Sequence, residues 1–415
     1  MSGHAWVVGV ASTPFTRMGE RTHASLAEEV VTAALADGRT AGADVGRVWF
    51  GNCGMHGWGQ ANIRGQVALK GMLRDGRLSP DAGVVNIEAA CATGSATFAD
   101  AVAAARAGAV DLGLAVGVEK VFHPGDLAAT FGVFVGGADV QGREEWLGYL
   151  AEQAALHDLP WAPHPARIVF VDVHALAAQH HMKTYGTTAA QMAYVAAKDH
   201  AHGALNPLAQ YGTPTDPAEV LADKPVVGPF TRSMCCPVSD GAVAVVVASD
   251  AGLARLPPEV RARAVKVRAA ELTGGRWRGL DEPSVVDRGV ARAFAAAGIT
   301  GADVDVAEVH DASSFCEIGA VEAMGLCPRG EGGPFSASGA TRLGGAVPVN
   351  TSGGLVSKGH PLAATGLGMI QEITLQLRGE AGARQVEGAS LGVTQNAGGL
   401  VAVDEAMCGV TVLSR

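Results

Sequence analysis

Residues 92–107 form the stretch that most limits how this chain can fold. They include only two charged residues, Asp100 and Arg106, and most of the others are Ala, Ser, Thr or Gly. The composition predicts a helix that has no polar face, and such a helix lies inside a protein. Its small side chains let neighbouring backbones approach closely. Gly108 supplies a C-terminal cap, and a strand is expected directly after it.

Short β-branched runs alternate with Ala-rich runs along most of the 415 residues, which indicates an α/β fold. The chain is 48% hydrophobic and 17% charged, so it can bury a large interior, and it is long enough for two related domains. The predicted strands are 6–10, 48–51, 84–87, 112–118, 242–248, 304–309 and 391–393. The predicted helices are 26–36, 92–107, 189–201, 286–297, 315–324 and 362–377.

Residues from about 123 to 223 differ from the rest of the chain. They contain several prolines, two histidine-rich patches and few strand signals. We interpret this region as an insertion of loops and helices that covers a site. A linker-like stretch, DAGLARLPP, ends near residue 258. The expected domains are therefore 1–258, which includes the insertion, and 259–415.

Composition excludes several classes of function. A net charge of -10 and only 5% aromatic residues argue against a nucleic-acid or anionic-membrane partner. Neither a secretory leader nor an apolar run of membrane-spanning length is expected. Seven scattered cysteines without a CxxC pair suit a reducing cytoplasm and disfavour structural zinc, so no metal site is predicted. The adjacent Cys235 and Cys236 are interpreted as packing.

Cys91 lies in the segment NIEAACATGSATFADA, between an apolar run that predicts a buried strand (84–87) and the uncharged helix. At a helix N-terminus, backbone N–H groups and the helix dipole stabilise a thiolate and lower its pKa by about one unit or more from roughly 8.5. The same groups can bind an oxyanion. Free cysteine is also a common core residue, so this stretch alone leaves both interpretations open.

Two histidines favour the catalytic interpretation. His310 follows the predicted strand 304–309 and precedes a helix, while His360 lies just before Pro361, a residue typical of a first helical turn. The glycines before His360 allow sharp turning and close approach to a ligand. Cys/His catalysis needs a base near the sulfur although the residues are distant in sequence. The other histidines, including His174, His180 and His202, are interpreted as structural or surface groups.

Five motifs, in order along nearly the whole chain, resemble those of the thiolases, and specifically their sterol-carrier-protein-type branch. They are NIEAACATGSA, TRSMCCPVSDGAVAVVVAS, EVHDASSFCEIGAVEAMGLCP, NTSGGLVSKGHPLAATG and VTQNAGGLVAV. The resemblance implies a five-layered αβαβα fold of two similar halves with an inserted loop domain. It also implies an acyl-CoA substrate, coenzyme A as a co-substrate with no permanently bound cofactor, and at least a homodimer.

The resemblance also implies roles for individual residues. Cys91 would attack a thioester or β-ketothioester carbonyl, His360 would accept its proton, and His310 would help to hold an enolate oxygen. Backbone N–H groups of Cys91 and of the Gly398–Gly399 turn would form the other oxyanion hole. Residues expected to contact substrate or CoA are Ser239, Ser352, Gly353 and Lys358, with Lys224 and Arg232 as further candidates for its phosphates.

One part of the thiolase pattern is missing. Thiolases carry a second cysteine as acid/base at the substrate α-carbon, but this chain has Gln395–Asn396–Ala397 at one usual position and Ala312 at the other. Cys316 would lie about one helical turn further on and is interpreted as packing. Three functions stay open: cleavage of β-ketoacyl-CoA with a histidine or water moving that proton, plain acyl transfer, or retro-aldol cleavage of a β-hydroxyacyl-CoA. Retention of Cys91 favours the first two.

The altered motif also bears on substrate and partners. Similar thiolase-like chains resemble proteins that work with a small zinc-bearing OB-fold subunit, so such a partner is expected here. Trp146, Trp161 and Phe170 in the insertion suggest a bulky, branched, steroid-like or aromatic acyl group, for example that of benzoylsuccinyl-CoA. A scaffold subunit without chemistry is the non-enzymatic alternative, and the retention of Cys91, His310 and His360 argues against it.

Overall fold

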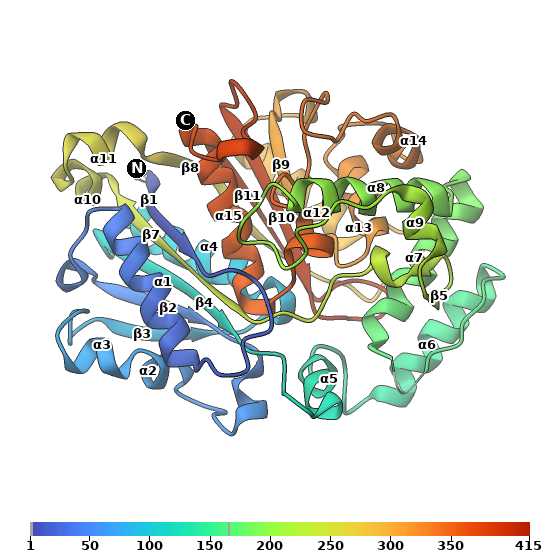
Figure 1. The fold of residues 1–415 in the computed structure, drawn as a ribbon, viewed down its shortest axis with the longest axis horizontal. Helices are drawn as coiled ribbons and strands as arrows, with labels where there is room; N and C mark the ends of the chain where they lie inside the picture. Colours follow the sequence, from blue (N-terminus) through green and yellow to red (C-terminus); the bar gives the residue numbers. More distant parts are fainter. Residues whose placement is uncertain (1–2, 165–166) are drawn as a thin grey trace.

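The computed structural model describes residues 3–164 and 167–415, and within them it contains a nine-stranded mixed sheet (Figure 1). The order across the sheet is β3-β2-β4-β7-β1-β8-β11-β10-β9. The strands are β1 (Ala5–Ser12), β2 (Arg47–Gly51), β3 (Gly83–Ile87), β4 (Leu112–Glu119), β7 (Gly241–Ser249), β8 (Val265–Gly274), β9 (Val306–Val309), β10 (Leu391–Gly398) and β11 (Met407–Ser414).

The two halves of this sheet repeat one topology. In the first half β2 runs parallel to β4, which pairs antiparallel with β7, which pairs antiparallel with β1. In the second half β9, β10, β11 and β8 repeat these pairings in the same order. A short antiparallel contact between β1 and β8 joins the halves. We propose that the domains 1–258 and 259–415 each correspond to one copy of this repeat.

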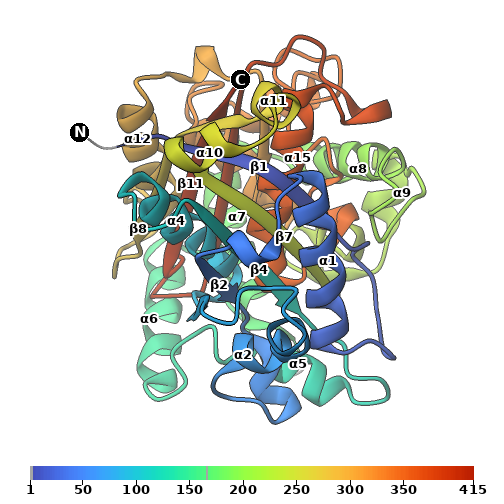
Figure 2. The same cartoon turned by 90° about the vertical axis from the view of Figure 1, so that its left-hand side faces the viewer.

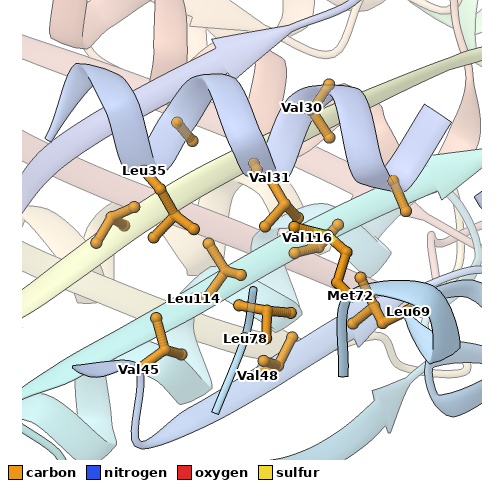
Figure 3. Packing of buried hydrophobic residues seen from close by; sticks show 14 of the residues in the cluster. Val30, Val31, Leu35, Val45, Val48, Leu69, Met72, Leu78, Leu114 and Val116 are labelled. Carbon is orange, nitrogen blue, oxygen red and sulfur yellow. The ribbon is translucent and has the colours of Figure 1, made fainter. Parts of the chain in front are cut away.

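Helices form three layers around the two half-sheets. Helix α1 (His23–Asp37) covers the outer face of the first half and α12 (Val285–Ala297) with α13 (Ser314–Ala323) that of the second. Helices α4 (Thr93–Arg106) and α15 (Leu362–Arg378) lie between the halves (Figure 1). This arrangement confirms the predicted five-layered fold. Figure 2 looks onto α1, which packs on β7 and β4, and Figure 3 shows Val31 and Leu35 of α1 pointing toward Leu114 and Val116.

Burial on both faces explains why the central strands are apolar without alternation. Along β7, Ala244 and Val246 belong to the core beneath α1, whereas Val243 and Val245 belong to the core around α4 and α15. Strands covered on both sides have no solvent face that would need polar residues. Helix α4 is buried along most of its length, as its uncharged sequence predicts.

The inserted region lies between β4 and β7 and is mostly helical. It occupies the green segment on the right of Figure 1. Its elements are α5 (Leu127–Val135), α6 (Arg143–Leu156), α7 (Val169–Tyr185), α8 (Ala189–Gly203), α9 (Pro217–Ala222), β5 (Pro225–Val227) and β6 (Phe230–Thr231). The remaining short helices are α2 (Arg64–Ala68), α3 (Lys70–Arg74), α10 (Asp250–Arg255), α11 (Pro258–Arg263) and α14 (Gly332–Ala337). Among the described residues, no helix is both long and apolar enough to cross a membrane.

Strand β3 corrects one prediction. Residues 84–87 do form a strand, but the prediction that it is buried is wrong, because every residue of β3 is exposed or partly exposed. The strand lies at the edge of the sheet and pairs only with β2, so its other edge has no partner strand in the described part of the chain. The apolar residues of β3 therefore belong to a strand at the sheet edge, and helices do not bury them.

Candidate active site

Cys91 lies in a short 3₁₀ turn, Ala90–Ala92, that joins edge strand β3 to the buried helix α4. The residue is only 5% exposed. The end of strand β10 passes so close that a Cβ atom at Gly398 would lie 2.5 Å from the Cys91 nitrogen and 2.3 Å from the Ala92 nitrogen. Only glycine permits this approach. Strand β10 of the second half therefore packs directly against the turn that contains Cys91 in the first half.

The environment of Cys91 corrects the prediction of a lowered pKa. Burial, followed by the charge of Glu119, raises the pKa of the Cys91 thiol to about 12. The backbone N–H groups of Cys91 and Gly399 act in the opposite direction but are outweighed. Desolvation penalises an isolated thiolate more than two N–H dipoles favour it. In the resting protein Cys91 is therefore a neutral thiol that needs a base.

His360 has the geometry of that base. Its Nδ1 lies 2.8 Å from the Thr365 hydroxyl oxygen, and that hydroxyl donates to the carbonyl of Pro361 at 3.0 Å. Because the hydroxyl proton is committed, the oxygen accepts from Nδ1–H, and Nε2 keeps its lone pair. Nε2 is buried without a hydrogen-bond partner. Burial and then the charge of His174 lower the pKa of His360 to about 3, so the ring is neutral.

His310 has the opposite tautomer. Its Nδ1 lies 2.8 Å from the amide nitrogen of Asn396, whose oxygen accepts a hydrogen bond from the Ser95 hydroxyl at 3.0 Å. An amide nitrogen only donates, so Nδ1 accepts and Nε2 carries the proton. Burial, followed by the charges of His360 and His174, lowers the pKa of His310 well below its usual value. His310 is therefore a neutral hydrogen-bond donor.

These three residues meet although they are far apart in sequence. The sulfur of Cys91 and one ring nitrogen from each of His310 and His360 all lie within 4.8 Å of one another. The two imidazole rings meet edge to face with their centroids 5.0 Å apart. All three side chains line one cavity of about 70 Å³, together with Gly398 and Gly399. The predicted nucleophile, both histidines and the glycine turn thus share one enclosed space.

Buried carboxylates hold the loops that carry these histidines. Asp311 accepts hydrogen bonds from the backbone N–H groups of Leu355 and Val356, in the segment that leads to His360. Glu119 accepts from the N–H groups of Cys53, Gly54 and Ala363. Burial raises the pKa of Asp311 to about 8 and that of Glu119 to about 7. Both residues were missed in the sequence as site-forming groups because their role depends on contacts between distant loops.

The four residues predicted to contact substrate or CoA do not line the cavities that contain Cys91, and all four are buried. Ser239 accepts a hydrogen bond from the N–H of His360, Ser352 donates to Glu308, and the Lys358 ammonium lies 3.3 Å from the Gly368 carbonyl. These hydrogen bonds tie the loops around the site together, and contact of Ser239, Ser352, Gly353 and Lys358 with CoA stays a prediction. Lys224 and Arg232 are exposed, and Arg232 pairs with Asp223.

Two side chains that sequence reasoning left out, His174 and Glu405, also line the cavity around Cys91. His174 comes from α7 in the insertion, which also contains His180 and His181, and no motif in the sequence distinguishes His174 from them as a functional residue. Glu405 lies in the connection between β10 and β11. Both residues also line a second cavity of about 250 Å³, so they lie between the two cavities.

The aromatic residues proposed for substrate recognition have different positions. Phe170 lines the catalytic cavity together with Phe134. Trp146 is fully buried, and its indole N–H donates to the Ala402 carbonyl at 3.0 Å. Trp161 packs at the edge of the same hydrophobic cluster as Trp146. The substrate role proposed for Trp146 is therefore wrong, because this residue fixes the insertion to the core.

The fold is a duplicated α/β architecture with paired central helices, and comparison with known proteins places it in a family. The model described as "Thiolase, N-terminal domain" matches residues 5–213, and "Thiolase C-terminal domain-like" matches residues 280–412. The chain therefore belongs to the thiolase family.

Individual relatives extend this assignment. The chain is 33% identical to an acetyl-CoA acetyltransferase of Methanothermobacter thermautotrophicus (95% of this chain, 96% of the relative) and 33% identical to human sterol carrier protein 2 (95% and 69%). It is 29% identical to the benzoylsuccinyl-CoA thiolase subunit BbsB of Thauera aromatica (78% and 77%). A solved structure titled "Ltp2-ChsH2(DUF35) aldolase" shares the fold, with a TM-score of 0.77, 20% identity and coverage of 100% and 98%.

Proposed function

We propose that this protein is a thiolase-type acyltransferase that cleaves a β-ketoacyl-CoA with coenzyme A through an acyl group on Cys91. The observation that carries this proposal is the free Nε2 lone pair of His360, buried beside the Cys91 thiol and the Nε2–H of His310. A neutral base, a neutral thiol and a neutral donor are the groups that acyl transfer at a thioester requires.

Each group then has a distinct role. His360 Nε2 takes the proton of Cys91 as the sulfur attacks the β-keto carbon. The N–H groups of Cys91 and Gly399 stabilise the resulting oxyanion, and each such donor contributes about 3 kcal/mol. His310 Nε2–H holds the enolate oxygen of the departing acyl-CoA. His310 donates through Nε2, which argues against that nitrogen as a metal ligand, so we propose no metal in this site.

We further propose a bulky or aromatic acyl group. Phe134, Ile168 and Phe170 give the catalytic cavity apolar walls, and the adjoining cavity of about 250 Å³ supplies room beyond them. The name of the Thauera relative, benzoylsuccinyl-CoA thiolase subunit, fits an aromatic substrate of this kind.

Retro-aldol cleavage of a β-hydroxyacyl-CoA is the second candidate function. It is favoured by the absence of a thiol at both usual positions, since Ala312 and Ala397 line the cavity there, and by the fold shared with a structure titled as an aldolase. A scaffold without chemistry is a weaker alternative, because it would not need two buried histidines with opposite, fixed tautomers.

Intact-protein mass spectrometry after mixing with acyl-CoA compounds separates these functions. We expect an acyl adduct on the wild-type chain and none on Cys91→Ser. A β-hydroxyacyl-CoA that is cleaved equally well by both proteins would establish the aldolase. If no acyl-CoA gives an adduct, with or without a partner subunit, the thiolase proposal is wrong.

The pH dependence of acylation provides an independent prediction. Burial places the pKa of His360 near about 3 and that of Cys91 near about 12, so both residues keep the productive protonation state between these limits. We expect neither His360 nor Cys91 to titrate between pH 5 and 9, so that any change of kcat/KM for Cys91 acylation in this range comes from Glu119 or Asp311, whose pKa values burial raises to about 7 and about 8. Stopped-flow release of CoA by the wild type and by Glu119→Gln would measure it. A titration with a midpoint near 6.5, the ordinary value for histidine, that persists in Glu119→Gln would contradict the assignment of His360 as a buried neutral base.

We also propose a cytoplasmic homodimer that works with a further subunit. Strand β3 offers an open sheet edge and exposes Val85 (39%), and such an edge is suited to pairing with a second copy. Two neighbours are named as parts of assemblies, the BbsB subunit and the Ltp2-ChsH2(DUF35) aldolase, which supports a partner such as a small zinc-bearing OB-fold protein. Light scattering after size exclusion, with and without co-expressed neighbours, tests both points.

A further inference from the structure

We propose that His174 is the catalytic group that moves the proton at the substrate α-carbon, and that the charge of Glu405 stabilises its protonated form. This inference rests on the proposed thiolase function and names the group that would replace the missing second thiol. His174 comes from the inserted helix α7, whereas the other catalytic groups come from the duplicated core.

The position of His174 supports this role. It is 9% exposed and lines the cavity that also contains Cys91, His310 and His360. Its Nδ1 atom is buried without a hydrogen-bond partner. A buried imidazole nitrogen without a partner costs free energy unless a ligand or a transferred proton completes it. No group of the described residues therefore competes with a substrate for this nitrogen.

The charges around His174 suit a base that becomes protonated. Burial lowers the pKa of His174, so the free imidazole is neutral, while the charge of Glu405 acts in the opposite direction. Glu405 lines the same two cavities as His174. A carboxylate beside an imidazole stabilises the imidazolium that forms when the ring takes a proton. Burial raises the pKa of Glu405, whereas the charges of His174 and Arg278 act in the opposite direction, so a protonated His174 in turn favours the carboxylate form of Glu405.

Cys236 is the alternative group, because it also lines this cavity and lies close enough to Cys91 for their charges to interact. To act as a base, Cys236 would have to become a thiolate. Burial, Cys235, Cys91 and Asp311 all raise its pKa. These groups all disfavour the thiolate of Cys236, whereas the charge of Glu405 favours protonated His174, so the surroundings favour the histidine.

The proton balance of the reaction is complete with these groups and one solvent proton. His174, neutral in the free protein, takes up a proton from solvent when the substrate binds. In cleavage, the bond between the α-carbon and the β-carbon breaks, its electron pair forms the enolate held by His310, and His174 gives its proton to the α-carbon. Coenzyme A then gives its thiol proton to His174, and the CoA thiolate attacks the acyl group on Cys91. The new thioester forms as the Cys91 sulfur leaves and recovers its proton from His360. The proton lost by CoA therefore replaces the one gained at carbon.

Two partial reactions of acetyl-CoA and propionyl-CoA test this assignment in the full chain. Acylation of Cys91 is followed by intact mass, and exchange of the α-protons is followed by deuterium uptake from D2O. We expect His174→Gln to slow exchange about 100-fold while acylation is unchanged, and Glu405→Gln to slow exchange about 10-fold. Unchanged acylation also shows that the variant site is folded.

Two further variants make the test decisive. Cys236→Ala, the matched control, should exchange at the wild-type rate. Ala312→Cys in the His174→Gln background should restore part of the exchange, because residue 312 lines the same cavity and supplies an acid/base thiol. Full exchange in His174→Gln, loss of exchange in Cys236→Ala, or an acylated wild type that never exchanges would each overturn the inference. Absence of acylation in the wild type would instead refute the thiolase function on which it rests.

Discussion

Replacing His360 by alanine should slow acylation of Cys91 about 1,000-fold, within the range that a positioned general base contributes. The thiol has its pKa raised to about 12 by burial, so it cannot ionise without a base in contact. His310→Ala is the matched control, because it removes the neighbouring imidazole of the same cavity. We expect His310→Ala to acylate normally and to lose the carbon–carbon step, since its Nε2–H serves the enolate.

Single-turnover kinetics with an acyl-CoA and with a β-ketoacyl-CoA measure the two steps separately. Thr365→Val offers a milder change, because it keeps the His360 ring and removes only the oxygen that accepts from Nδ1–H. Acylation should then fall about tenfold, as expected for one misoriented hydrogen bond. Equal loss of acylation in His360→Ala and His310→Ala would contradict this division of roles.

A single methyl group at Gly398 should also abolish most of the activity. Its Cβ would lie 2.3 Å from the Ala92 nitrogen and 2.5 Å from the Cys91 nitrogen, and both neighbours are backbone atoms that cannot rotate away. We expect Gly398→Ala to lower kcat/KM about 100-fold, because a displacement of about 1 Å at a reacting group has that effect. Overpacking should lower the free energy of unfolding by about 1–3 kcal/mol.

Gly71→Ala is the control for this substitution. Gly71 lies in helix α3, where an added Cβ meets no atom within 4 Å, so activity should be unchanged. Urea unfolding and steady-state kinetics of both variants measure the two effects. Wild-type activity in Gly398→Ala would mean that the turn containing Cys91 is not clamped by strand β10.

Sequence motifs predicted which residues meet at the site but not their electrostatic state. Cys91 and His310 could be identified because each follows a strand signal and precedes a helix signal, and His360 because it follows a glycine cluster and precedes Pro361. The direction in which the pKa of Cys91 is shifted could not be predicted, because it depends on how completely Phe134, Leu362 and other distant residues exclude water. The tautomers of the two histidines depend on Thr365 and Asn396, whose contacts only the folded chain reveals. His174 was missed because its helix carries no local motif.

Strand prediction was most accurate where a run was continuously apolar. Strand β7 was predicted almost to its ends, because burial on both faces makes every residue apolar. Strand β8, VKVRAAELTG, was missed since its charged residues interrupt the pattern, and β11, MCGVTVLS, was missed although it crosses the core. The exposure of β3 could not be predicted because an edge position is a property of strand order, which no local run encodes.

The insertion between β4 and β7 has a consequence for how such proteins diversify. The groups proposed for acyl transfer lie on the duplicated core, whereas α7 brings the group proposed for chemistry at carbon. Substitutions confined to the roughly one hundred residues of the insertion would therefore change the reaction at carbon, while Cys91, His310 and His360 of the core stay the same. Thiolysis, simple acyl transfer and aldol cleavage would then differ in the insertion and share one core fold.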